Sequence, residues 1–208
     1  MIRADTVVLK RGRRLLLSGL SFDLNPGQCL EIVGPNGCGK TSLLKLLSQL
    51  TQPFKGSIHY SLLDQKPLYL ALKSGFDPER SVWDNLCYLL ALENRDDKNL
   101  ENIFVKFQLQ YFKDKPYGFL SAGQKQRAHL MRLLLWPRQC WLLDEPITSL
   151  DQEGEDLLRQ ICHDHLTKGG SILVATPRPL GIGKVIDLTK LEALRFDFFE
   201  ESEEVKWA

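Results

Sequence analysis

The sequence is poor in the residues that bind metals or form disulfide frameworks. Its five cysteines are scattered without a CxxC pair, and only four histidines occur among 208 residues. This composition excludes a disulfide scaffold and the common zinc modules, and it favours a reducing compartment. His163 and His165 lie close together, but no second ligand pair is near them, so we expect both at the exposed surface of a helix end.

A strong net charge and a long apolar segment are also missing. The formal net charge of +1 gives no general basic field for nucleic acid. No uninterrupted apolar run approaches the roughly 18 residues of a membrane span, and the N-terminal stretch MIRADTVVLK lacks the apolar core of a signal peptide. We therefore expect a cytoplasmic protein that binds no nucleic acid and that contacts a membrane peripherally or through partners.

The hydrophobic pattern alternates between the periods of strands and helices. Short apolar runs bounded by turn residues predict strands, and leucines at helical spacing predict helices. Alternation of the two along the chain predicts an α/β fold, with a parallel sheet and helices on its faces. We expect strands at 5–9, 20–24, 29–33, 140–143 and 171–175, and helices at 41–50, 122–135 and 153–166.

Residues 75–120 have a different character, and we expect them to form a small helical subdomain. Ser81 and Asp84 form an S-x-x-D capping pattern before the apolar stretch DNLCYLLALE, and a second amphipathic helix follows. The chain is long enough to bury one good core. We therefore expect a single domain over 1–208 that contains this subdomain and ends in a tail, 191–208.

The most specific motif is GPNGCGKT, which matches G-x-x-x-x-G-K-[ST] and lies between a predicted strand and a predicted helix. Its glycines let backbone N–H groups surround a phosphate, and the helix N-terminus directs its positive dipole end at the same anion. Lys40 would add a charge on the β- and γ-phosphates, and the Thr41 hydroxyl would bind Mg²⁺. The predicted phosphate-binding residues are Gly34, Pro35, Asn36, Gly37, Cys38, Gly39, Lys40, Thr41 and Ser42.

CWLLDE, from Cys140 to Glu145, is an apolar strand that ends in two carboxylates. This pattern alone is weak, since many apolar strands end in acidic residues, but here it follows a complete phosphate loop. We predict that Asp144 holds Mg²⁺ or its water. Glu145 would be the general base that polarises the attacking water.

LSAGQ and DEPITSLD complete a set of motifs. Ser121 and Gln124 form a capping box, which alone could explain both residues, but a capped helix N-terminus is also an anion site. With the phosphate loop, these segments resemble the signature, Walker B box and D-loop of ABC-type ATPases, in the family's order and over roughly residues 5–180. By this resemblance the signature residues are Ser121, Ala122, Gly123 and Gln124, and the D-loop residues are Ser149, Leu150 and Asp151.

A narrower resemblance concerns the ATP-binding subunits of cytochrome c maturation haem exporters. It is carried by the stretch LLLSGLSFDLNPGQCLEIVGPNGCGKTSLLKLL, the SAGQ form of the signature and HLTKGGSILVAT. The resemblance implies a P-loop NTPase of the ABC ATPase type, with a mixed sheet core, a small helical subdomain and an N-terminal antiparallel β part. It also implies ATP and Mg²⁺ as cofactors.

The resemblance implies partners as well. Two nucleotide domains, as a homodimer or another dimer, would pair head to tail, so that Ser121 and Gly123 of one contact the γ-phosphate bound at Lys40 of the other. Integral membrane subunits of a haem export complex would dock on the helical subdomain. The protein would then lie peripherally on the inner face of the cell inner membrane.

Two positions depart from the family pattern at the site of hydrolysis. The family's switch histidine falls on Pro177, which cannot bond to a γ-phosphate, although Arg178 or Thr176 could replace it. The Q-loop residue falls near Leu72, which can neither bind Mg²⁺ nor orient water. Because these gaps affect hydrolysis more than binding, we predict that the chain binds ATP–Mg²⁺ well and hydrolyses it slowly on its own.

The residue that would stack on adenine is a third departure. No aromatic residue occurs before residue 20, where the family has one. The cluster of Arg11, Arg13 and Arg14 around Gly12 is either a solvated turn or, through Arg11 or Arg14, a planar substitute for that aromatic ring.

Three functions stay open from the sequence. The chain is the ATPase of a haem-handling ABC complex, an ATP-binding regulatory subunit that barely hydrolyses, or the ATPase of another small ABC exporter. The intact Glu145 argues against the second. A DNA-repair ABC protein does not fit, because the helical subdomain is too short for a coiled coil and the net charge is near neutral.

Overall fold

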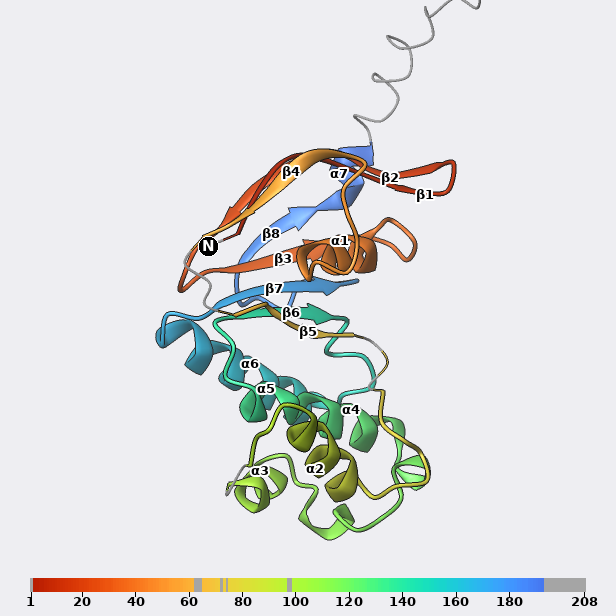
Figure 1. The fold of residues 1–208 in the computed structure, drawn as a ribbon, viewed down its shortest axis with the longest axis vertical. Helices are drawn as coiled ribbons and strands as arrows, with labels where there is room; N and C mark the ends of the chain where they lie inside the picture. The colour runs from red at the N-terminus through yellow and green to blue at the C-terminus, as the bar shows by residue number, and fades with distance from the viewer. Residues whose placement is uncertain (1, 62–64, 72, 74, 97–98, 193–208) are drawn as a thin grey trace, which may run out of the picture.

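The computed structural model describes residues 2–61, 65–71, 73, 75–96 and 99–192. Two sheets and a group of helices follow one another along the long axis of the molecule (Figure 1). The strands are β1 (Ile2–Arg11), β2 (Arg14–Leu24), β3 (Cys29–Val33), β4 (Lys55–Tyr60), β5 (Leu68–Leu70), β6 (Cys140–Asp144), β7 (Ser171–Thr176) and β8 (Lys184–Asp187). The helices are α1 (Lys40–Leu47), α2 (Val82–Leu92), α3 (Leu100–Lys106), α4 (Ala122–Leu130), α5 (Arg132–Leu135), α6 (Gln152–Thr167) and α7 (Leu188–Glu192), with short 3₁₀ turns η1 (Gln110–Phe112) and η2 (Tyr117–Phe119).

The five-stranded sheet brings the ends of three predicted strands together. Its order is β5-β6-β7-β3-β8, and all neighbouring strands are parallel. Val33 lies opposite Thr176, and Asp144 lies opposite Ala175, so β3, β6 and β7 end side by side. Every residue of β6 and β7 is buried, as expected for apolar strands that are covered on both faces. Polar side chains on the loops that follow these strands can therefore lie close enough to form one site.

The three-stranded sheet is antiparallel, with the order β2-β1-β4. Its first two strands are longer than the sequence predicted and are joined by a tight turn at Gly12. The φ of Gly12 is +62°, a left-handed conformation that favours glycine. Because β1 and β2 extend this far, their turn carries Arg11 and Arg14 towards the loop that precedes α1.

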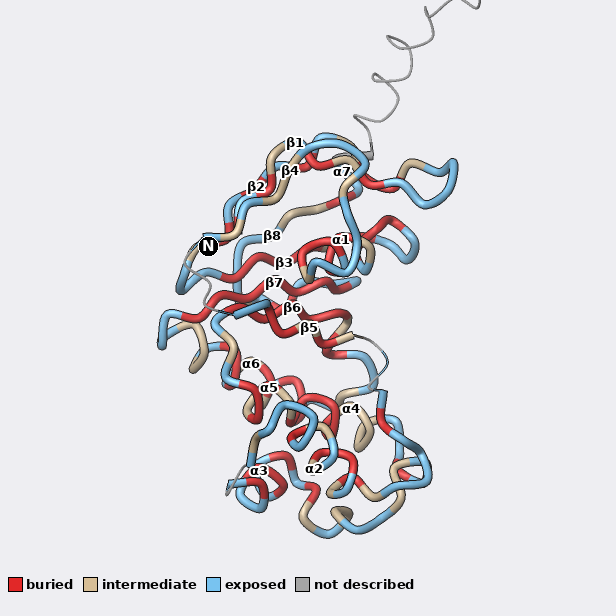
Figure 2. Tube along the Cα trace, in the orientation of Figure 1, coloured by how far each residue is buried: buried red, intermediate tan, exposed pale blue. Residues whose placement is uncertain are grey.

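Two apolar cores hold the layers together. One core surrounds α1 between the two sheets, and the other joins the opposite face of the five-stranded sheet to the helices. Adjacent residues of β6 face different cores, since Leu142 belongs to the first and Leu143 to the second. Figure 2 shows this as buried segments along β3, β6 and β7 and on parts of the helices.

The region predicted to be a helical subdomain contains α2, α3 and the two 3₁₀ turns. The predicted cap is confirmed, because Ser81 Oγ accepts a hydrogen bond from the Asp84 N–H at 3.0 Å. Trp83 stacks on Phe104 with 5.7 Å between ring centroids, which packs α2 against α3. The exact limits of the subdomain stay a prediction, and the predicted tail lies outside the described residues from 193 onwards. Among the described residues, none of the helices combines the length and the apolar composition of a membrane span.

Two local predictions were wrong. The single helix expected over 122–135 is divided into α4 and α5 at Met131, where the chain tightens and the Leu134 N–H bonds to the Met131 carbonyl at 3.1 Å. His165 was expected at an exposed helix end. Instead its ring lies flat on Trp141, with 3.6 Å between centroids, because the end of α6 packs against the sheet.

Stability is expected to fall in mild acid because of two histidines. Burial lowers the pKa of His129 to about 4, with a smaller contribution from the charge of Arg132, and burial also lowers the pKa of His165 to about 4. Below the unfolded pKa of about 6.5, the unfolded chain therefore binds protons that the folded chain does not. Protonation of His129 in the unfolded chain should cost about 2 kcal/mol of unfolding free energy at pH 5 relative to pH 7, and the less buried His165 should contribute less.

Urea unfolding at pH 7 and pH 5 tests this expectation. Replacing His129 with Gln should reduce the pH dependence, whereas the same change at exposed His163 should leave it intact. Equal unfolding free energies at the two pH values would refute the assignment.

Candidate functional site

The loop between β3 and α1 has the backbone shape that the glycine motif predicts. Gly37 and Gly39 have φ values of +81° and +110°, and Gly39 caps α1 at its N-terminus. A Cβ atom on Gly39 would lie 3.2 Å from Leu17 Cγ and 3.3 Å from Leu16 Cβ. Glycine is therefore required both by conformation and by space, and the N–H groups that start α1 stay open to an anion.

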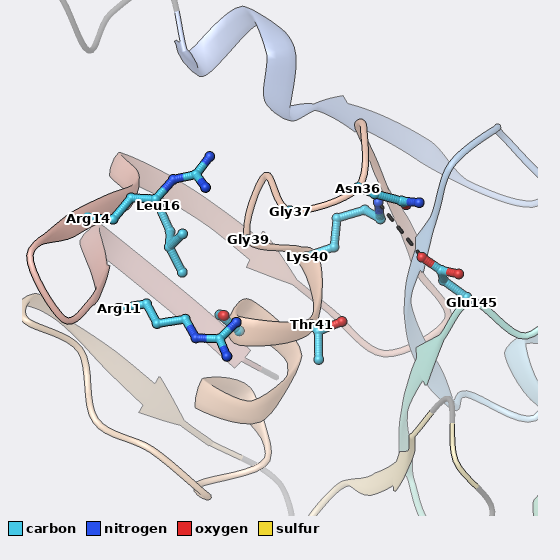
Figure 3. A pocket seen from close by; sticks show the side chains of 10 residues that line it. Arg11, Arg14, Leu16, Asn36, Gly37, Gly39, Lys40, Thr41 and Glu145 are labelled. Carbon is cyan, nitrogen blue, oxygen red and sulfur yellow. Dashed lines mark ion pairs between the residues drawn. The ribbon is translucent and has the colours of Figure 1, made fainter.

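Lys40 lies inside this loop and is only 5% exposed. Its Nζ donates hydrogen bonds to the carbonyl oxygens of Gly34, at 2.7 Å, and Pro35, at 3.1 Å. It also lies 4.0 Å from Glu145 Oε1, and Figure 3 shows the two side chains pointing towards each other. The ammonium group is thus held at the centre of the loop, where it can bind a phosphate.

Asp144, at the end of β6, is held by two hydroxyl groups. Thr41 Oγ1 donates to Oδ1 at 3.1 Å, and Tyr69 Oη, from β5, donates to Oδ2 at 3.3 Å. Burial raises the pKa of Asp144, and these two hydrogen bonds oppose the rise. The pKa of Tyr69 is also raised, by burial and by the nearby carboxylate, so its hydroxyl remains a donor. The carboxylate and the Thr41 hydroxyl are hard oxygen donors, which fit Mg²⁺.

Tyr69 was missed at the level of sequence. The register of β5 against β6 places Tyr69 opposite Leu142, two residues before Asp144. β5 has only three residues, which is too short a run to show a reliable strand period. The apolar stretch LYL was the only available signal.

Glu145 has a strained backbone and a side chain that faces the phosphate loop. Its φ is +50°, in the left-handed region that non-glycine residues rarely adopt. Its N–H bonds to the Ala175 carbonyl at 2.8 Å, which fixes it to the end of β7. The Glu145 side chain is 22% exposed and lines a cavity of about 480 Å³ with Lys40 and Thr41. A carboxylate in this place can polarise a water molecule beside a phosphate.

The basic turn between β1 and β2 also lines this cavity. Arg11, Arg14 and Leu16 lie on the side of the phosphate loop away from Glu145 in Figure 3. Both arginines are exposed and Leu16 is buried. Arg11 and Arg14 therefore share a cavity with the phosphate loop, their stacking on adenine stays a prediction, and Arg13 is not part of the cavity lining.

We expect the double change Arg11→Ala and Arg14→Ala to weaken ATP binding. A guanidinium stacked on a base contributes about 1–2 kcal/mol, so the dissociation constant should rise roughly 5- to 30-fold. Fluorescence titration with ATP measures this, and Arg13→Ala in the same turn is the matched control. Unchanged ATP affinity in the double variant would eliminate the stacking hypothesis.

Most of the predicted signature and D-loop residues line a second cavity, of about 410 Å³; they are Ser121, Gly123, Gln124, Ser149 and Asp151, whereas Ala122 and Leu150 are not part of its lining. The capping box is present, since the Gln124 N–H donates to Ser121 Oγ at 3.2 Å and the Ser121 N–H donates to Gln124 Oε1 at 3.0 Å. A Cβ on Gly123 would lie 3.0 Å from the Ser149 carbonyl oxygen. Signature and D-loop therefore touch, and their cavity shares no lining residue with the cavity of the phosphate loop.

Asp151 ties the D-loop to the signature helix. Its Oδ1 accepts from Arg127 Nη2 at 2.6 Å and from the Gly154 N–H at 2.9 Å. The hydrogen bond from Arg127 is the largest cause that lowers the pKa of Asp151. The Arg127–Asp151 pair joins α4 to the N-terminus of α6.

At the corner after β7, Thr176 and Arg178 were suggested as substitutes for the switch histidine, and both already have partners. Thr176 is buried, and its hydroxyl donates to the Arg178 carbonyl oxygen at 2.8 Å. The Arg178 guanidinium forms an ion pair with Glu155 on α6. Pro177 itself is exposed. The predicted Q-loop position, Leu72, lies outside the described residues.

Known proteins resemble the chain in sequence and in fold. A family model described as ABC transporter matches residues 17–148. The "Cytochrome c biogenesis ATP-binding export protein CcmA" of Methylococcus capsulatus is 40% identical over 183 residues, which cover 83% of this chain and 88% of that protein. The protein of the same name from Shewanella sp. (strain MR-4) is 35% identical over 209 aligned positions, which cover 95% of this chain and 94% of that protein.

Two solved structures have a similar fold. An ABC transporter ATP-binding protein of Pyrococcus furiosus superposes with a TM-score of 0.78 at 23% identity and covers 91% of this chain and 98% of its own. A bacterial ABC transporter cassette that was solved as a dimer gives a TM-score of 0.77 at 21% identity and covers 90% and 94%. At these low sequence identities, the similarity to the two structures shows a shared fold and nothing more.

Proposed function

Because the chain belongs to the ABC transporter family of ATP-binding proteins, we propose that it is the ATP-hydrolysing subunit of a membrane complex that handles haem for c-type cytochrome assembly. The fold class predicted from the sequence is confirmed, and the chain is an ATP-binding protein and an ATP hydrolase. The observation that carries the cellular role is the 40% identity to a protein named as a cytochrome c biogenesis ATP-binding export protein. A regulatory subunit or another small exporter is not favoured, since further relatives bear the same name.

In the proposed reaction, the phosphate loop binds the phosphates, and the residues at the end of β6 hold Mg²⁺ and activate water. The N–H groups of the loop and Lys40 Nζ would bind the β- and γ-phosphates. Asp144 and Thr41 would hold Mg²⁺, which, when bound, neutralises charge on the phosphate oxygens. Glu145 would take a proton from the attacking water and so support its attack on the γ-phosphorus.

The second cavity would complete the site of another nucleotide domain. Ser121 and Gly123 lie at a helix N-terminus with exposed polar groups, which suits a terminal phosphate. In one chain this cavity is separate from the phosphate loop, so a head-to-tail pair of domains would place ATP between the two. The predicted dimer agrees with the dimeric form in which the similar cassette was solved.

The helical region would be the docking surface for the membrane subunits. Several large apolar side chains are exposed there, which is uncommon for a surface without a partner. They are Tyr88, Leu92, Val105, Tyr111 and Phe119. Docking through this surface would hold the protein peripherally on the inner face of the cell inner membrane.

A genetic experiment tests the proposed role. In the cell that makes this protein, deletion of its gene should abolish covalently bound haem in periplasmic c-type cytochromes, measured by haem staining after denaturing electrophoresis. The wild-type gene should restore it, and the Glu145→Gln gene should not. Normal haem staining in the deletion strain would reject the role in cytochrome assembly. It would not bear on the assignment of the chain as an ATPase.

A further inference from the structure

Glu155, in the first turn of α6, is a buried carboxylate that receives two arginines. Its Oε1 pairs with Arg178 Nη2, and its Oε2 lies 3.0 Å from Arg159 Nη2. Arg159 Nε also donates to the Leu180 carbonyl oxygen at 3.2 Å. Since Glu155 is only 8% exposed, the two arginines replace contacts with water that its carboxylate lacks. We call Glu155, Arg159 and Arg178 the Glu155 clamp, because together they hold both ends of the corner at 178–180.

The chain beyond this corner is fixed by a second buried carboxylate. Glu31 on β3 is fully buried and accepts hydrogen bonds from the backbone N–H groups of Leu180, Ile182 and Gly183 at 2.6, 2.6 and 2.8 Å. Residues 177–179, in contrast, are exposed. The Glu155 clamp therefore supplies the contacts from α6 that reach this exposed segment.

The corner is connected to Glu145 by a short series of hydrogen bonds. Thr176 Oγ1 bonds to the Arg178 carbonyl oxygen at 2.8 Å, so Arg178 holds the end of β7. The preceding residue, Ala175, accepts the Glu145 N–H at 2.8 Å. Glu145 has a φ of +50°, and a residue in this conformation keeps it only where neighbouring contacts impose it. A shift of the corner should therefore release Glu145 from its position.

We propose that Glu155 is a positioning residue for ATP hydrolysis, because it holds Arg178 and thereby keeps the end of β7 where it fixes the backbone of Glu145. The inference rests on the proposed role of Glu145 as general base. Pro177 has no side-chain donor or acceptor with which to bind at this corner. The Glu155 clamp, from α6, thus holds the corner in place, which the side chain of Pro177 cannot do.

Steady-state kinetics and ATP titration of Glu155→Gln test the proposal. The variant keeps the size of the side chain and removes its charge. A base displaced by a fraction of an ångström loses rate without losing the phosphate contacts, so kcat should fall about 10-fold, while the ATP dissociation constant changes less than about twofold. A kcat within twofold of the wild type, or a parallel loss of kcat and ATP affinity, would overturn the proposal.

Arg178→Gln and the double variant identify the pathway. If Glu155 acts through Arg178, the single changes should have similar effects on kcat, and the double change should be no more harmful than the worse single change. Additive losses would overturn the proposed pathway. Arg3→Gln is the matched control, because it removes one side of the Arg3–Asp5 ion pair on β1, away from the corner.

Hydrogen exchange of the full-length chain gives a readout that does not need hydrolysis. The Glu145 amide should exchange at least about 10-fold faster in Glu155→Gln than in the wild type, and at the wild-type rate in Arg3→Gln. If the wild type fails to hydrolyse ATP even with its membrane subunits, the proposed function fails, and this exchange rate alone decides on the clamp. Equal exchange in wild type and Glu155→Gln would overturn the clamp, even in an active enzyme.

Discussion

The change Glu145→Gln should lower kcat for ATP roughly 100- to 10,000-fold, which is the usual contribution of a general base. The amide keeps the shape of the side chain but cannot accept a proton from water. Lys40, Thr41 and the loop amides are untouched, so ATP affinity should stay within a few-fold of the wild type. Phosphate release and ATP titration on the same preparations measure the two effects separately.

The exposed Glu101 on α3 provides the control for this change. Glu101→Gln removes an acid that pairs with Lys113 at 3.0 Å and should leave kcat unchanged in the isolated chain. Turnover by Glu145→Gln at the wild-type rate would mean that another group acts as base. In that case the strained backbone of Glu145 would need a different explanation.

The change Lys40→Ala should weaken ATP binding more than any other single change in the loop. The ammonium group forms two hydrogen bonds to carbonyl oxygens within the loop, and it is positioned to exchange them for phosphate oxygens. Charge-assisted hydrogen bonds contribute about 2–3 kcal/mol, so the dissociation constant for ATP should rise roughly 30- to 150-fold. Hydrolysis at ordinary ATP concentrations should then be lost.

Lys45 on the same helix is the matched control. It is exposed, and Lys45→Ala should bind ATP as the wild type does. Comparing the unfolding free energies of both variants separates a binding defect from a folding defect. If Lys40→Ala is stable and binds ATP with unchanged affinity, the assignment of the phosphate site is wrong.

The sequence predicts those parts of the site that are contiguous in the chain. Gly34 to Thr41 form a local loop between one strand and one helix, so the spacing alone predicts the shape of the loop. Asp144 and Glu145 end a strand, and parallel pairing places that end beside the loop. The capping box of Ser121 and Gln124 is likewise a local pattern, and its geometry agrees with the prediction.

Contacts between distant segments could not be predicted. Tyr69 reaches Asp144 across 75 positions, and Glu31 reaches the amides of 180–183 across about 150, and neither contact has a local signature. The stacking of His165 on Trp141 depends on how the end of α6 meets the sheet. Tertiary packing determines these contacts. It also gives Arg178 and Thr176 partners within the chain, which the sequence did not predict.

The ATPase rate of the purified chain, measured alone and with its membrane subunits, tests the account most directly. The intact residues Lys40, Thr41 and Asp144 predict that the isolated chain binds ATP–Mg²⁺ well. The departures from the family pattern at Pro177 and near Leu72 predict that it hydrolyses ATP slowly. We further expect a rate that rises when the membrane subunits are present and that is lost in Glu145→Gln. Fast, Glu145-dependent turnover by the chain alone would contradict it, as would hydrolysis by the complex that does not depend on Glu145.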